Sequence, residues 1–234
     1  MLWYKAWLET RSRFLIALVG SVVLCSRLVV VFLRKGAPTQ LSQVLHATHE
    51  TLAAVWLLAV TLIMMGGLLR EKAAGSSSFT LSLPVSRLRL MSVRIAMGLA
   101  EAILLAILPW IAMLFYARVA SKMPFIEQAS IHVFLLLGGG VLFLAASFLI
   151  SSFVEGEYTA PIVSCGAIIM FAYLMSDDKL RPYSPWAFML GSEYFHWRTA
   201  QFVGPISWIH AGVFAAIAAF VTLASIKLIQ WRDF

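Results

Sequence analysis

Six long apolar stretches run through the chain and restrict it to a membrane protein. Each is close to the length of about 20 predominantly apolar residues that an α-helix needs to cross a bilayer. They are Phe14–Leu33, Thr51–Leu69, Ile95–Tyr116, Ile131–Phe153, Thr159–Met175 and Val203–Ile229. Of the 234 residues 61% are hydrophobic and 12% are charged, whereas soluble domains have about 45–50% apolar and about 25% charged residues. Only short loops remain, so we expect one all-α membrane domain over residues 1–234 with six transmembrane helices.

The net charge of +7 indicates how the chain is oriented in the membrane, and we do not expect nucleic-acid binding. Loops rich in Lys and Arg are retained on the cytoplasmic side during insertion. With both termini inside, the inner side carries ten Lys and Arg residues and the outer side seven. We therefore expect a multi-pass protein of the inner cell membrane with both termini in the cytoplasm.

The two cysteines and the N-terminal region exclude two other readings. Cys25 and Cys165 both lie in apolar stretches, so no disulfide framework is expected. The apolar run that follows Arg13 has no small-residue cleavage site. It predicts a retained first span, not a signal peptide.

The first thirteen residues, MLWYKAWLETRSR, have the pattern of an interfacial helix. Trp3 and Trp7 share one helical face, whereas Lys5, Glu9 and Arg13 recur every four residues on another. Tryptophans lie at headgroup level in such helices, and basic residues face the cytoplasm. The alternative is a cytoplasmic tail without regular structure.

Residues 176–202, which we call the outer segment, form the longest predicted loop. It contains Pro182 and Pro185, followed by the aromatic-rich stretch Trp186–Trp197. This stretch is too short and too polar to cross the membrane. We expect it to lie in the outer interface or to dip back as a re-entrant structure.

Several polar residues fall within or beside the apolar stretches. Glu101 and Arg27 are candidates for functional sites because a charge in hydrocarbon is unfavourable by about 2.5–3.5 kcal/mol or more. They lie near opposite ends of their spans, so we do not expect them to pair. Arg27 is expected to extend toward the outer interface. Glu101 either faces an inner cavity or hydrogen-bonds Ser or Thr on a neighbouring helix.

Three further groups of residues could have a chemical function, and for each we expect a structural role instead. His46, His49 and Glu50 share a helical face and could ligate zinc, but the H-E-x-x-H order of metalloproteases is absent and no metal site is expected. The Glu155–Glu157 turn is expected to be solvated or to contact a partner. The run Gly138–Gly140 is expected to allow close packing against a neighbouring helix.

The motifs of an energy source or a hydrolase are missing. The sequence has no G-x-x-x-x-G-K-[ST] for ATP phosphates, no G-x-S-x-G and no H-E-x-x-H. We therefore expect no catalytic residue and no cofactor in this chain. A membrane protein of this kind is expected to move or to bind a substrate.

The segment Arg70–Arg94, REKAAGSSSFTLSLPVSRLRLMSVR, carries the most specific signal. It is a polar, basic stretch between two apolar ones, and five of the eighteen Lys and Arg residues lie in it. Such a short basic loop is expected in the cytoplasm. Its order of charges, glycine and serines, apolar patch and proline is typical of a docking element for a soluble partner.

Residues 70–87 of this segment resemble the inner loop between the second and third spans of type 2 ABC transporter permeases. The matching positions are Glu71, Gly75 and the L-P-V-S-R ending, Leu83–Arg87. The Trp-rich start, the six spans and the outer segment are similar to that family as well. The resemblance implies that segment 70–87 forms a coupling helix in a groove of a separate ATPase. The implied coupling residues are Glu71, Gly75, Phe79, Leu81, Leu83, Pro84 and Arg87.

The same resemblance implies the partners. Two copies of an ABC ATPase subunit, which bind ATP and Mg, would drive two permease subunits in a homodimer or heterodimer embedded in membrane lipid. The apolar spans suggest export of a hydrophobic or amphipathic substrate. Glu101, Trp186, Phe188 and Trp197 are the candidate pathway residues.

Two other functions remain open from the sequence. The chain could be a membrane-embedded enzyme acting on lipid or peptide, with Glu101 or the Glu155–Glu157 pair as catalytic groups. It could also be a scaffold or sensor subunit without a pathway of its own. In the last case it would change the activity of a partner without moving a substrate.

Overall fold

The fold is described from a computed structural model, which covers residues 2–34, 41–64, 86–119, 126–154, 159–196 and 201–231. These residues are predominantly helical. The α-helices are α1 (Leu2–Arg34), α2 (Leu41–Met64), α5 (Arg87–Val119), α6 (Ile126–Ser151), α7 (Thr159–Leu174), α8 (Pro185–Leu190) and α9 (Trp208–Trp231). A 3₁₀ turn, η1 (Arg181–Tyr183), and two short strands, β1 (Phe195–His196) and β2 (Gln201–Phe202), complete the described elements.

Four of the described helices are long and apolar enough to cross a membrane. They comprise Gln43–Met64 in α2, Leu88–Phe115 in α5, Ile126–Ser151 in α6 and Trp208–Leu228 in α9. The apolar helix α7 has 16 residues and is shorter than a typical span. The all-α, membrane-spanning character predicted from the sequence is therefore supported, and the number of six crossings stays a prediction.

Helix α1 joins two segments that the sequence separates. The predicted interfacial helix and the predicted first span belong to one uninterrupted helix of 33 residues. At 1.5 Å per residue it is about 50 Å long, more than the thickness of the hydrocarbon core. No Pro or Gly lies between Leu2 and Val19 to break it, so nothing in the local sequence ends the helix at Arg13.

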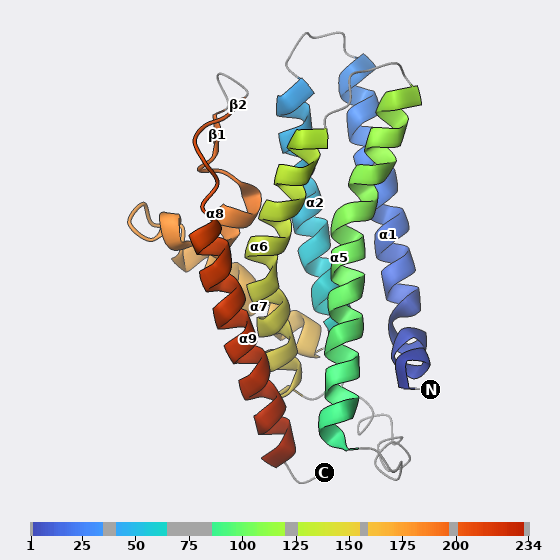
Figure 1. Ribbon diagram of the computed structural model, residues 1–234, viewed down its shortest axis with the longest axis vertical. Coiled ribbons are helices and arrows are strands. Elements are labelled where there is room, and N and C mark those ends of the chain that lie inside the picture. Colours follow the sequence, from blue (N-terminus) through green and yellow to red (C-terminus); the bar gives the residue numbers. More distant parts are fainter. Residues whose placement is uncertain are drawn as a thin grey trace.

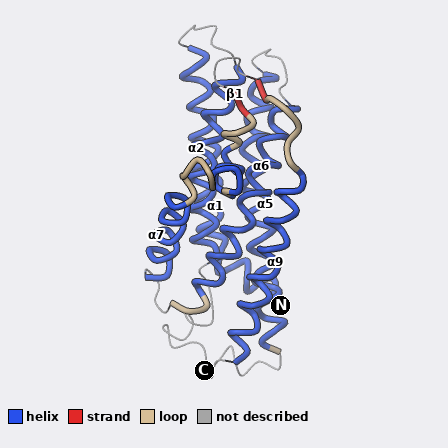
Figure 2. Tube along the Cα trace, turned by 90° about the vertical axis from the view of Figure 1, so that its left-hand side faces the viewer, coloured by secondary structure: helices blue, strands red, loops and turns tan. Residues whose placement is uncertain are grey.

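The long helices run side by side along the longest axis of the molecule (Figure 1). The start of α1, the end of α2, the start of α5 and the end of α9 lie at one end of the bundle (Figure 1). Strands β1 and β2 lie toward the opposite end, as both views show (Figures 1 and 2). The two helix ends that flank segment 65–85 are therefore at the same end of the bundle as the start of α1 and the end of α9.

Aromatic side chains fill the core between α2, α5 and α6. Trp56 of α2 is 1% exposed, and its indole N–H donates to the backbone oxygen of Ala102 on α5 over 2.8 Å. Gly140 of α6 lies against the same indole, because a Cβ atom there would come within 2.5 Å of the Trp56 ring. The close packing expected at Gly138–Gly140 is confirmed at this contact.

Helix α8 has the start and stop signals of a helix in its own sequence. The Ser184 hydroxyl accepts a hydrogen bond from the Ala187 backbone N–H, and Pro185 occupies the first turn. Gly191 ends the helix with φ 71°, a left-handed conformation that favours glycine. The helix then packs onto α6, where a Cβ atom on Gly139 would lie 2.5 Å from the Pro185 carbonyl oxygen.

Candidate functional site

Most of the implied coupling residues cannot be placed. Glu71, Gly75, Phe79, Leu81, Leu83 and Pro84 lie outside the described residues, as do the Glu155–Glu157 turn and Trp197. Arg87 is the first residue of α5. The role of these residues in coupling stays a prediction.

The start of α1 is bonded to both helices that flank segment 65–85. Glu9 forms an ion pair with Arg94, two turns into α5. Arg13 Nη1 donates to the backbone oxygen of Leu62, near the end of α2, over 2.8 Å. The N-terminal part of α1 thus connects the two helix ends between which the predicted coupling segment lies.

Glu101 is buried in the contact between α1 and α5. Its side chain is 1% exposed, and Oε1 accepts a hydrogen bond from the Thr10 hydroxyl. Thr10 Oγ1 also lies 3.2 Å from the backbone oxygen of Ala6. Of the two roles left open for Glu101, the structure supports the hydrogen bond to Thr on a neighbouring helix. Arg27 is exposed on α1, in line with the expectation that it extends away from the core.

The two candidate pathway aromatics that the structure describes, Trp186 and Phe188, pack against the bundle. Phe188 is 4% exposed and packs with Leu135 and Phe214 in a small cluster of its own. Trp186 is half-buried, with its ring 6.2 Å from that of Phe143 at 80°. Guidance of a cargo by Trp186 and Phe188 at the outer surface stays a prediction, and their position favours a role in anchoring α8.

Three of the five histidines form a cluster that is closed to solvent. His46 and His49 come from α2 and His132 comes from α6, and each has an exposed fraction of 0%. The ring centroids of His49 and His132 are 4.5 Å apart, and those of His46 and His132 are 5.6 Å apart. We call these three residues the histidine cluster.

Hydrogen bonds to backbone carbonyls define the tautomers in the cluster. His132 Nδ1 lies 2.7 Å from the Gln128 oxygen, and His49 Nε2 lies 2.8 Å from the Met189 oxygen. A carbonyl only accepts, so both nitrogens carry a proton. In a neutral imidazole the other nitrogen is then an acceptor, so His132 Nε2 accepts from His46 Nδ1, 3.3 Å away. His46 and His132 thus form a directed chain of donors that ends at the Gln128 oxygen, and His49 donates separately to the Met189 oxygen.

Aromatic rings close the cluster on two sides. Trp110 of α5 stacks on His132 with centroids 5.0 Å apart and an angle of 13°. Phe195 of β1 stacks on His46 at 4.0 Å and 14°, and Phe202 of β2 places its edge against His132 at 5.2 Å. Residues of the outer segment therefore form one wall of the cluster.

The zinc arrangement left open by the sequence is not formed. Glu50 Oε1 lies 3.8 Å from His46 Nε2, the ring nitrogen that does not bind His132. Within the described ranges, no three His, Cys, Asp or Glu side chains are arranged to hold a metal ion. Four of the six ring nitrogens are engaged with carbonyls or with another ring instead.

Sequence reasoning found only part of this cluster. The i, i+3 spacing drew attention to His46 and His49, but His132 follows 83 residues after His49. The local sequence gives one indication that His132 has a special role. The residue lies in the first turns of a strongly apolar helix, and a polar ring buried there requires a hydrogen-bond partner. The partners lie on α2 and could not be identified without the tertiary structure.

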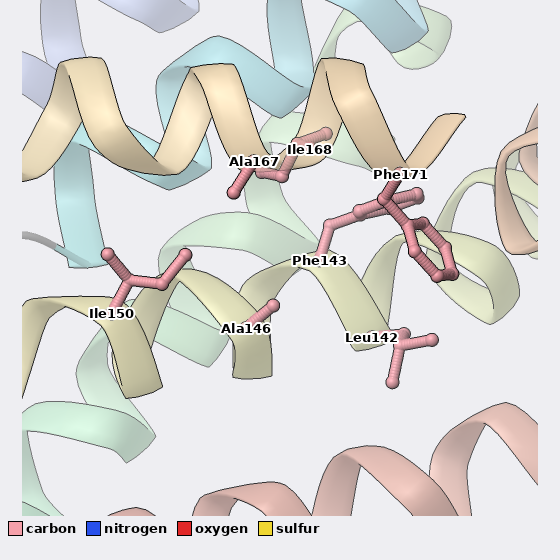
Figure 3. Close-up of a pocket in the computed structure, with 7 residues that line it drawn as sticks. All are labelled: Leu142, Phe143, Ala146, Ile150, Ala167, Ile168 and Phe171. Atoms are coloured by element: carbon pink, nitrogen blue, oxygen red, sulfur yellow. The ribbon is translucent and has the colours of Figure 1, made fainter. Parts of the chain in front are cut away.

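Two apolar cavities open between the helices. One of about 260 Å³ lies between α6 and α7, lined by Leu142, Phe143, Ala146, Ile150, Ala167, Ile168 and Phe171. Figure 3 shows the side chains of the two helices around this space, and the rings of Phe143 and Phe171 meet edge to face at 6.4 Å. A second cavity of about 370 Å³ lies between α5, α6 and α9. Neither cavity contains a charged side chain.

The chain was compared with known protein families, characterised proteins and solved structures, and no match was found in any of them.

Proposed function

We propose that the chain is the membrane subunit of an ATP-driven exporter of the type 2 ABC permease kind. The observation that carries the proposal is segment 70–87, with its charged start, Gly75, and the ending Leu83–Arg87. The sequence lacks a phosphate-binding loop of its own. Transport against a gradient requires an energy source, which a separate ATPase would supply.

The arrangement of the helix ends supports this proposal. The end of α2 and the start of α5 lie with the start of α1 and the end of α9 at one end of the bundle (Figure 1). Lys and Arg are abundant in these regions, which favours a cytoplasmic location for all of them. A cytoplasmic ATPase could then reach segment 70–87.

The proposed cargo is hydrophobic or amphipathic. The two cavities between the long helices have apolar linings, with Thr222 as a polar residue in the second. A homodimer or heterodimer of permeases would form the complete pathway, with ATP and Mg bound by the two ATPase subunits.

The first experiment tests the location of the coupling segment. Cys25 and Cys165 are replaced by Ser, and single cysteines are introduced as Ser77→Cys in the segment or Asp178→Cys in the outer segment. In intact cells a membrane-impermeant maleimide should label only the Asp178→Cys protein. Labelling of Ser77→Cys in sealed cells would place the segment outside and overturn the proposal.

The second experiment tests the partner. The tagged full-length chain is co-purified with the ABC ATPase encoded nearest to its gene. Gly75→Pro and Glu71→Ala should reduce recovery of the ATPase, because they disturb the proposed coupling helix. Glu193→Ala, in the outer segment, is the matched control and should leave recovery unchanged. Absence of any ATPase with the unmodified chain would contradict the proposal.

A further inference from the structure

The histidine cluster has no role in the proposed coupling to an ATPase, yet its chemistry is specific. We propose that it is a proton-binding site that holds the outer segment against the bundle while its imidazoles are neutral and releases the segment when more than one proton is bound. The ligand is a proton from the solvent. This inference does not depend on the identity of a transport partner.

The neutral cluster has three N–H donors and three acceptor nitrogens. The three neutral rings use their three N–H groups on Gln128, Met189 and the neighbouring His132 Nε2. Each added proton turns an acceptor nitrogen into a donor. The closed cluster is therefore sensitive to protonation at each of its three remaining nitrogens.

In the closed form, in which the outer segment packs against the cluster, only one of those nitrogens has an acceptor for an added proton. His46 Nε2 faces Glu50 Oε1 at 3.8 Å, so a proton there would create an ion pair. Protonation of His132 Nε2 would set two donors against each other at 3.3 Å. His49 Nδ1 is buried without an acceptor among the described residues, so a proton on it would be an unsatisfied donor.

A route for the proton is visible in the same geometry. The Glu50 side chain is 40% exposed, whereas that of His46 is 0% exposed. A proton that reaches His46 Nε2 from Glu50 allows the Nδ1 proton to pass to His132. Glu50 thus connects solvent with the interior of the cluster.

The outer segment is the part of the protein that responds. It contributes the Met189 carbonyl that binds His49 and the stacked Phe195 and Phe202 rings. A second proton would place two cations in a dry site with ring centroids 4.5–5.6 Å apart. Hydration relieves that repulsion, and water can enter where these two rings and α8 move away.

The groups that face the cluster do not neutralise the charge of a second imidazolium ring. Among the described residues, Glu50 of α2 is the acidic group in contact with it. Helix α5 contributes Trp110, α8 contributes a backbone carbonyl, and the strands contribute Phe rings. A stacked aromatic ring attracts one imidazolium through its π face and adds no second counter-charge.

Hydrogen exchange tests the proposal on the full-length protein in phospholipid nanodiscs. Exchange of peptide 184–196 is followed by mass spectrometry from pH 8 to pH 5, corrected for the intrinsic pH dependence of amide exchange. In the open form the outer segment has moved away from the cluster. Each proton that the open form binds and the closed form does not raises the open population about tenfold for each pH unit by which the pH falls below the pKa of a solvated histidine, about 6.5. We expect at least this slope in peptide 184–196, with no comparable slope in peptide 208–220 of α9. A corrected exchange rate that does not depend on pH would overturn the proposal.

Variants separate the cluster from other titrating groups. In the double variant His46→Asn and His49→Gln, the amide groups replace the N–H donors at Nδ1 and Nε2 and leave only His132 to titrate. The slope should fall to about tenfold per pH unit or less. His196→Gln, an exposed histidine of β1 outside the cluster, is the matched control and should retain the original slope. An unchanged slope in the double variant would refute the role of the cluster.

A measurement on the unmodified sequence tests the tautomers directly, and the single variants serve only to assign its signals. Nitrogen-15 NMR of labelled imidazoles, assigned with the single variants, reports the tautomers at pH 8. We expect Nδ1–H for His46 and His132 and Nε2–H for His49. Other tautomers, or cationic rings at pH 8, would contradict the donor chain on which the proposal rests.

Discussion

The contact between α6 and α8 leads to a quantitative prediction for Gly139→Ala. A Cβ atom on Gly139 would lie 2.5 Å from the Pro185 carbonyl oxygen and 2.8 Å from Met189 Cβ. Contacts below 3.0 Å are essentially never seen for real Cβ atoms. The nearest atom belongs to the α8 backbone and cannot rotate away, so the substitution requires α8 to move off α6.

The expected loss of stability follows from two opposing effects. Overpacking of a close contact is unfavourable by about 3 kcal/mol at the upper end of its usual range, which suits a clash with backbone. Alanine is better than glycine inside a helix by about 1 kcal/mol. The net loss of about 2 kcal/mol lowers the melting temperature of a chain of this size by roughly 4–8 °C.

Thermal unfolding of the purified protein in detergent, followed by tryptophan fluorescence and circular dichroism, measures this change. Gly212→Ala in α9 is the matched control, because nothing lies within 4 Å of a Cβ atom there. Its melting temperature should stay the same or rise. If Gly139→Ala is as stable as Gly212→Ala, the close packing of α8 on α6 is not a source of stability and the reasoning fails.

Two further substitutions test buried polar contacts in the same melting assay. Trp56→Phe removes the N–H that binds the Ala102 oxygen and should lower stability by at least about 1 kcal/mol, whereas Trp208→Phe, at a residue that is 73% exposed, should have little effect. Equal melting temperatures for these two variants would contradict the hydrogen bond. Glu101→Gln keeps an acceptor for the Thr10 hydroxyl and should leave the melting temperature nearly unchanged. A loss as large as that of Gly139→Ala would show that the site does not accept an amide in place of the carboxyl group, whose Oε2 is buried without a hydrogen-bond partner among the described residues.

The Glu101 substitution also bears on function. Glu101 lies between α1 and α5 with Thr10 as its polar partner. The ion pair between Glu9 and Arg94 joins the same two helices. If Glu101→Gln keeps its stability and its transport activity, the residue has a packing role. Loss of transport in a stable variant would favour the pathway role predicted from the sequence.

The helical elements could be predicted from local sequence to a large extent. Long apolar stretches mark α2, α5, α6 and α9 because each has to bury its own backbone hydrogen bonds in an apolar medium. The continuous α1 was not predicted, since the change from a Trp-rich polar start to an apolar run resembles a boundary. Backbone hydrogen bonding continues across it, because no residue there interrupts a helix.

The candidate sites were predicted less completely. The i, i+3 relation of His46 and His49 is a local pattern and was visible. The burial of Phe188 was not predicted, because an aromatic residue near a membrane interface can face either lipid or protein. Which side it faces depends on the packing of α8 against α6.

The sequence by itself determined that this chain is a helical membrane protein with a basic segment between two of its helices. The length, hydropathy and charge of a segment are properties of that segment alone and do not depend on its tertiary contacts. Only the tertiary structure decided that His132 joins His46 and His49, and that Phe195 and Phe202 cover them. These contacts bring together residues from α2, α6 and the outer segment that are far apart in sequence. Their partners are selected by which helix faces pack together, and no pattern within a single helix specifies that choice.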